Sequence, residues 1–213
     1  MTSLCSRVLL ALLLSPVLPL SAQTAGALGL FVGYYRPFGH FDPASIYSTA
    51  LPTEPSDLRG PAWGGLGQLV IHRRFGLEAQ LAVARSVLPE VITPAGPRGP
   101  TKAEVDIAAL EGQYDVSPRP ERYRVWLSAG PAMIRHGGDA YAPYGSPVSV
   151  GGAASAALVV PLRSELQLAF DLTTLWYEFD LAMPSQFQSN PGSLEHGAQR
   201  DALLRVGVRW GRL

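Results

Sequence analysis

The last part of the chain alternates strictly between two kinds of residue. In residues 203–210, Leu204, Val206, Val208 and Trp210 share one parity, whereas arginine and glycine occupy most of the other. Successive side chains of a β-strand point to opposite faces, so this period of two predicts a strand with one apolar and one charged face. Such a strand belongs to a soluble sheet if its apolar face points inward. It contacts lipid if its charged face points inward.

Seven further segments alternate in the same way, so the sequence predicts eight strands. The eight segments cover about 27–35, 63–72, 77–87, 104–116, 122–134, 148–160, 165–179 and 201–210. In the fourth segment Val105 and Ile107 fall on the wrong parity, and we expect a β-bulge there that restores the register. An even number of strands allows an antiparallel barrel to close with both chain ends on one side.

The connections between these segments alternate between short and long. The short ones lie around 74–76, 118–120 and 161–163, and the long ones, rich in Pro, Gly, Ser and charge, around 36–61, 89–103, 135–147 and 181–200. This alternation is typical of a transmembrane barrel with short periplasmic turns and long extracellular loops. The predicted fold class is therefore all-β: an eight-stranded antiparallel up-and-down transmembrane β-barrel.

Aromatic residues on the apolar parity are predicted to form two girdles. The girdle near the long loops comprises Tyr34, Trp63 and Trp176. The girdle near the short turns comprises Tyr114, Tyr123 and Trp210. Amphipathic aromatic rings prefer the interface between membrane and water. The apolar face is therefore expected to contact lipid. The alternative is a soluble, secreted, lipocalin-like barrel, in which these rings belong to the core.

The charged face would then fill the interior, because an eight-stranded barrel has room only for its own side chains. The predicted ion-pair network consists of Glu78, Glu111, Asp115, Arg124, Glu165, Asp171, Arg205 and Arg209. Pairing in the last hairpin places Asp171 opposite Arg205, and the second short turn brings Arg124 near Glu111 and Gln113. Buried charges must be paired and hydrogen-bonded, so we expect this network to plug the lumen.

Composition and the first residues indicate export. The formal net charge of zero gives no electrostatic reason to expect nucleic acid as a partner. Arg7, an apolar run over 8–14 and small residues before position 23 predict a signal peptide over 1–22, cleaved after Ala22. The barrel domain would then span 23–213. The one cysteine, Cys5, lies in the signal peptide, so the mature domain has no disulfide and no thiolate metal site.

Four histidines were considered as candidate site residues. His40, His136 and His196 are expected in three different long loops, and His72 is expected to face the barrel floor at a short turn. No two of the loop histidines have the spacing of metal ligands. We therefore predict no metal, no cofactor and no catalytic residue.

Residues 26–213 resemble the small outer-membrane β-barrels of Gram-negative bacteria, the class that includes the OmpA transmembrane domain and the OmpX-like proteins. In that class the last strand commonly carries an assembly signal of alternating apolar residues that ends in an aromatic. Leu204, Val206, Val208 and Trp210 match this signal, although the chain continues for three residues beyond Trp210. The resemblance implies residence in the cell outer membrane. It also implies three partners: outer-membrane lipid, the outer-membrane assembly machinery and periplasmic chaperones.

Members of this class serve as structural anchors, adhesins or surface-binding proteins, and a few modify lipids. We expect a non-enzymatic outer-membrane barrel with a plugged, charged lumen, which is structural or binds an unidentified ligand through its extracellular loops. The alternative is a lipid-modifying barrel enzyme. The class implies a histidine and a serine acting together at the outer surface of such an enzyme, and His136 with Ser146 or Ser149 is the one loose candidate.

Overall fold

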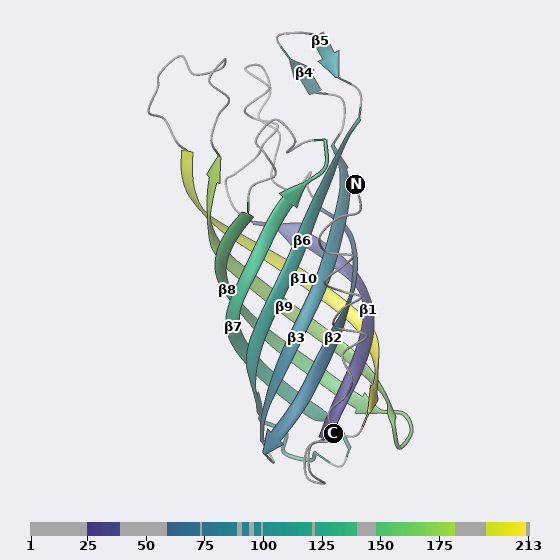
Figure 1. Ribbon diagram of the computed structural model, residues 1–213. Helices are drawn as coiled ribbons and strands as arrows, with labels where there is room; N and C mark the ends of the chain where they lie inside the picture. The colour runs from purple at the N-terminus through teal and green to yellow at the C-terminus, as the bar shows by residue number, and fades with distance from the viewer. Residues whose placement is uncertain are drawn as a thin grey trace, which may run out of the picture.

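In the computed structural model, eight antiparallel strands close into a tall barrel, and the strands are tilted relative to the barrel axis (Figure 1). The structure describes residues 25–38, 59–72, 74–88, 91–93, 96–98, 100–120, 122–139, 148–181 and 195–211. The barrel strands are β1 (Ala25–Pro37), β2 (Gly60–His72), β3 (Phe75–Leu88), β6 (Thr101–Asp115), β7 (Arg124–Gly137), β8 (Val148–Pro161), β9 (Leu166–Leu181) and β10 (Glu195–Gly211). The predicted signal peptide lies outside the described residues.

The strand order confirms the predicted up-and-down topology. Around the ring it runs β1-β10-β9-β8-β7-β6-β3-β2, and the first and last strands pair along their length, with Leu30 opposite Val208. Short turns join β2 to β3, β6 to β7 and β8 to β9 at one end, called the inner end here. The other connections leave from the outer end, where β4 (Val91–Thr93) and β5 (Gly96–Arg98) form a small hairpin (Figure 1).

The barrel wall exposes its apolar side chains and buries its charged ones. On β1, Leu28 and Leu30 are 61% and 63% exposed, whereas Arg205 and Arg209 on β10 are each 1% exposed. The other strands follow the same parity. A barrel with an apolar outer face has a lipid-facing surface, so the soluble lipocalin-like alternative is wrong. Among the described residues, no helix is long and apolar enough to span a membrane.

The outward face changes from apolar to charged near the outer end. On β6 the outward positions run from Leu110 through Ala108 to Asp106, Glu104 and Lys102. The same change occurs on neighbouring strands. Barrel strands here have 13 to 17 residues, whereas about 9–11 suffice to cross a bilayer at a tilt. The outer ends of the strands therefore extend beyond the hydrocarbon of the membrane.

The bulge expected at the start of β6 is absent, and that prediction was wrong. The β3–β6 register is continuous from Phe75 opposite Tyr114 to Leu88 opposite Thr101. Val105 and Ile107 are buried inside the barrel. Beyond the membrane boundary the outer face contacts water, so the polarity of the alternation reverses: charged side chains face out and apolar ones face in.

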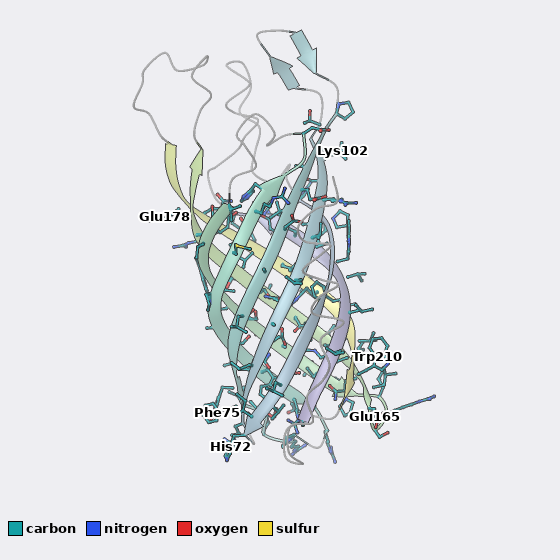
Figure 2. All side chains as sticks on the ribbon, in the orientation of Figure 1. His72, Phe75, Lys102, Glu165, Glu178 and Trp210 are labelled. Carbon is teal, nitrogen blue, oxygen red and sulfur yellow. The ribbon has the colours of Figure 1, made fainter. Side chains whose placement is uncertain are left out.

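An irregularity does occur at the inner end of β2, where the register with β3 shifts between Val70 and His72. Because a one-residue shift turns every following side chain to the other face, His72 is exposed. It lies at the inner end in Figure 2 and does not face the barrel floor as the sequence suggested.

The depth of the lipid-facing side chains gives a first prediction. Leu172 lies midway along β9 opposite Leu204, whereas Leu168 lies near Leu166, which pairs with Trp210 at the inner end. We expect Leu172→Arg to destabilise the barrel by about 2–4 kcal/mol, because the charge would lie near the bilayer midplane. Leu168→Arg should cost less. Urea unfolding in lipid vesicles measures both costs, and equal costs would contradict this depth assignment.

Candidate functional site

Three successive layers occupy the middle of the barrel interior. An inner apolar cluster near the short turns comprises Val70, Trp126, Ala157, Val159 and Ala169. An outer apolar cluster near the long loops includes Leu66, Ile107, Ile134, Leu175 and Leu203. Between them lies a central polar layer, which comprises Gln68, Glu78, Gln80, Glu111, Gln113, Asp171, Arg205 and Arg209. On β2 and β9 the inward positions follow this order from the inner end to the outer end.

Arg209 crosses the central polar layer. Its Nη1 donates to Glu78 Oε2 at 3.0 Å and to Gln68 Oε1 at 2.9 Å. Its Nη2 donates to Asp171 Oδ1 at 2.7 Å. Glu78 lies on β3 and Asp171 on β9, and these strands stand four places apart in the ring of eight. Arg209 therefore links two opposite walls of the barrel.

Arg205 shares the same two carboxylates. Its Nη2 lies 3.6 Å from Asp171 Oδ1 and 3.9 Å from Glu78 Oε1, and its Nη1 donates to Gln80 Oε1. The guanidinium also lies over the ring of Phe31, 4.8 Å from the ring centroid. The hydrogen bonds of Arg209 to Glu78 and Asp171 are charge-assisted and therefore stronger than neutral ones, whereas Arg205 Nη2 approaches the same carboxylates only at ion-pair distance.

Among the described residues, no cationic side chain forms an ion pair with the Glu111 carboxylate. Its Oε1 accepts from Gln80 Nε2 at 2.7 Å and its Oε2 from Ser128 Oγ at 2.6 Å. It lies directly opposite Glu78 in the β3–β6 pairing. The central polar layer thus contains three carboxyl groups and two guanidinium groups. Neutral amides supply further hydrogen bonds, as Gln113 Nε2 does by donating to Glu78 Oε2 at 2.8 Å, whereas Arg205 Nε and Nη2 and Arg209 Nε make none among the described residues.

The structure brings five of the eight predicted network residues together in this layer. They are Glu78, Glu111, Asp171, Arg205 and Arg209. The register places Asp171 opposite Arg205. Glu165 does not join them, because it lies exposed in the turn between β8 and β9, near the inner end in Figure 2.

Arg124 and Asp115 form a separate pair near the inner end. Arg124 Nη1 lies 3.7 Å from Asp115 Oδ2, and Asp115 Oδ1 also accepts from the backbone N of Ser117 at 2.8 Å. The expected position of Arg124 near Glu111 and Gln113 was wrong. The β6–β7 register places Ser128 opposite Gln113 and starts β7 only at Arg124, because the turn over 116–123 is longer than the sequence pattern suggested.

A second polar cluster at the outer end was missed. Asp201 accepts three hydrogen bonds: from Tyr35 Oη at 2.5 Å, Tyr177 Oη at 2.6 Å and Gln199 Nε2 at 2.9 Å. His136 Nε2 lies 3.2 Å from Tyr177 Oη. Asp201 has the same parity as Arg205 and Arg209 and is the first residue of the last predicted strand, so periodicity alone indicated that it faces inward.

Two of the three histidines expected in long loops lie in strands. His136 is in β7 and His196 in β10, because both strands continue beyond the membrane boundary. His40 lies outside the described residues. In the described part of the chain, no group of three or more His, Cys, Asp or Glu side chains could hold a metal ion.

Comparison with solved structures identifies this architecture. The Neisserial surface protein A (NspA) matches with a TM-score of 0.51 and 12% identity, over 88% of this chain and 95% of that chain. The chain has the fold of a small outer-membrane β-barrel. Together with the apolar outer face, this fold places the protein in the outer membrane.

Two further solved structures match less closely. Ail, the attachment invasion locus protein of Yersinia pestis, in complex with sucrose octasulfate, gives a TM-score of 0.44 at 9% identity, over 87% of this chain and 99% of that one. The outer membrane protein AlkL matches with a TM-score of 0.49 and 13% identity, over 89% of this chain and 90% of that chain. No protein-family model matches the chain, and no curated protein matches its sequence.

Most of the aromatic side chains predicted to form girdles are exposed on the outer surface of this outer-membrane barrel. Tyr34, Trp63, Trp176, Tyr114 and Trp210 are exposed, and Tyr123 is half-buried. Phe75, which the sequence analysis missed, packs against Tyr114 with ring centroids 5.0 Å apart, and Figure 2 shows it with Trp210 at the inner end. The assignment of these rings to the two interfaces stays a prediction.

The assembly signal also lies on the outer wall. Leu204, Val206 and Trp210 are exposed there, and Val208 is half-buried on the same face. Recognition of this segment by the assembly machinery stays a prediction.

The network gives a second prediction, on stability. Arg205→Leu would leave Glu78 and Asp171 with one guanidinium between them in a buried site. We expect a cost of about 3–5 kcal/mol, because removing one partner leaves an uncompensated buried charge. Urea unfolding in lipid measures it. The matched control is Arg163→Leu in an exposed turn, which should cost far less. Equal stabilities of the two variants would contradict the role given to Arg205.

Proposed function

We propose that this protein is a non-enzymatic outer-membrane barrel whose lumen is closed to ions and whose outer end carries its binding function. The observation that carries the proposal is the bridge across the lumen. Arg209 contacts Glu78 on β3 and Asp171 on the opposite strand β9, and Arg205 contacts the same two carboxylates. An ion that crosses the lumen would have to displace these paired groups.

The apolar clusters above and below the central polar layer support closure. Trp126 in the inner cluster and Ile134 and Leu175 in the outer cluster are fully buried. A hydrated ion would lose its water on passing between such side chains, which is costly without new partners. Three successive layers thus oppose conduction.

Burial at the outer end favours a non-enzymatic role. Ser149 and His136, two of the residues considered for a lipid-modifying site, are both buried inside the barrel rather than exposed at its rim. Ser146 lies outside the described residues. The proposed partners are outer-membrane lipid, the assembly machinery and periplasmic chaperones, with an unidentified extracellular ligand at the long loops and no nucleic acid.

Conductance in planar lipid bilayers tests the closed lumen. We expect no steady conductance from the wild-type barrel. Combined replacement of Arg205 and Arg209 by alanine removes the central layer, and conductance should rise when Trp126 and Leu175 of the two apolar clusters are replaced by alanine as well, provided that the variant folds. Faster migration of the unboiled sample in a detergent gel shows that a barrel has folded. Steady conductance of the folded wild-type protein would refute the proposal.

A further inference from the structure

The outer rim of the barrel carries an excess of outward-facing cations. The described ones are Arg36, Arg59, Arg85, Lys102, Arg135 and Arg200. On the β3–β6–β7 side, Arg85 Nε lies 2.8 Å from Glu104 Oε2, and Arg135 Nη1 lies 3.2 Å from Asp106 Oδ2. The cations on β10, β1 and the start of β2 have no such acidic partner among the described residues.

Three of these cations come from neighbouring segments of the wall: Arg36 from β1, Arg200 from β10, and Arg59 from the residue before β2. The β1–β2 pairing ends with Tyr35 opposite Gly60, so the next position brings Arg36 beside Arg59. On the other side of β1, the backbone N of Phe38 donates to the backbone O of Arg200 at 2.7 Å. We call Arg36, Phe38, Arg59 and Arg200 the arginine patch.

The arginine patch is built around an exposed aromatic ring. Phe38 is 59% exposed, and the Arg36 guanidinium lies 5.1 Å from its ring centroid. Arg36 and the adjoining Arg59 are two exposed like charges that repel each other, and an anion between them would relieve this repulsion. The exposed Glu178 on β9 pairs with Ala198 and makes no ion pair with Arg200 in the described part of the chain.

The height of the arginine patch indicates what that anion is. Arg36 lies two residues beyond Tyr34 on the same face, and Arg200 lies opposite Trp176. Both aromatic residues belong to the outer girdle, so the arginines lie at the level of the lipid headgroups. They face outward, away from the lumen. The outer leaflet of such a membrane contains phosphorylated glycolipid, and guanidinium groups bind phosphate through paired hydrogen bonds.

We propose that Arg36, Arg59 and Arg200 bind the phosphate groups of a glycolipid headgroup in the outer leaflet, with Phe38 packing against the sugar or the upper acyl chain. The site depends on the position of the barrel in the outer membrane and not on a closed lumen. A failure of this proposal would therefore leave the closed lumen proposed above unaffected, and a conducting lumen would leave this site unaffected.

The test compares two triple variants of the full barrel in detergent micelles. In the first, Arg36, Arg59 and Arg200 are replaced by glutamine. In the second, the matched control, glutamine replaces three arginines that are exposed at the inner end: Arg74, Arg119 and Arg163. Both triple variants therefore lose the same charge. Native mass spectrometry measures retention of diphosphorylated lipid A and of its dephosphorylated form at increasing lipid concentration.

We expect the wild type and the inner-end control to retain the phosphorylated form at least about tenfold more tightly than the dephosphorylated form, a preference that the outer triple variant loses. The preference should also weaken at high salt, as for exposed charges. If the triple variant fails the gel test of folding, Arg59→Gln alone, which changes a residue outside the strand, should give a partial loss.

Three outcomes would overturn the proposal. One is a wild-type barrel that does not discriminate between the two lipids. Another is an equal loss of discrimination in the inner-end control, which would reflect net charge alone. The third is complete displacement of the lipid by millimolar inorganic phosphate, which would make the patch a site for the free anion.

Discussion

The constraint on which the rest of the structure depends is that backbone polar groups inside lipid must find partners within the chain. Eight strands meet it because β1 pairs with β10 and no edge remains. Closure has a second consequence. It encloses a narrow interior that the inward side chains must fill and in which they must satisfy one another. Arg205 and Arg209 share the charges of Glu78 and Asp171 across the lumen, so the closed wall and the paired interior require each other.

The distribution of apolar and charged side chains between the two faces of a strand can reverse along its length. Within the membrane, β6 turns Leu110 outward to lipid and Glu111 inward to the polar layer. Beyond the boundary it turns Asp106 outward and Ile107 inward. The backbone alternates without interruption, and only the medium outside changes. The outer end of the barrel therefore encloses an apolar cluster as a soluble protein does, whereas the central layer behind the lipid-facing leucines is polar.

This change of medium explains which features the sequence could predict. The period of two is local, so it predicted eight strands, their faces and the short and long connections. It could not show that the apolar residues Val105 and Ile107 lie inside, because parity alone does not reveal where the membrane ends. His136 was expected in a loop for the same reason, because β7 continues beyond the membrane boundary. Contacts across the lumen, such as that of Glu78 with Arg209, join strands that are distant in the sequence, and pattern alone does not give their register.

Parity and height together assign different roles to arginines that lie close together in the sequence. Arg205 and Arg209 have inward parity at the depth of the membrane, so each needs carboxylates from other strands and is fully buried with them. Arg200 has outward parity beyond the boundary, where water and headgroups can solvate it. Between these levels, the outward positions of β10 are all apolar: Ala202, Leu204, Val206 and Val208. An outward arginine in that belt would face hydrocarbon without a partner, so the wall excludes charge there and concentrates it at the rim.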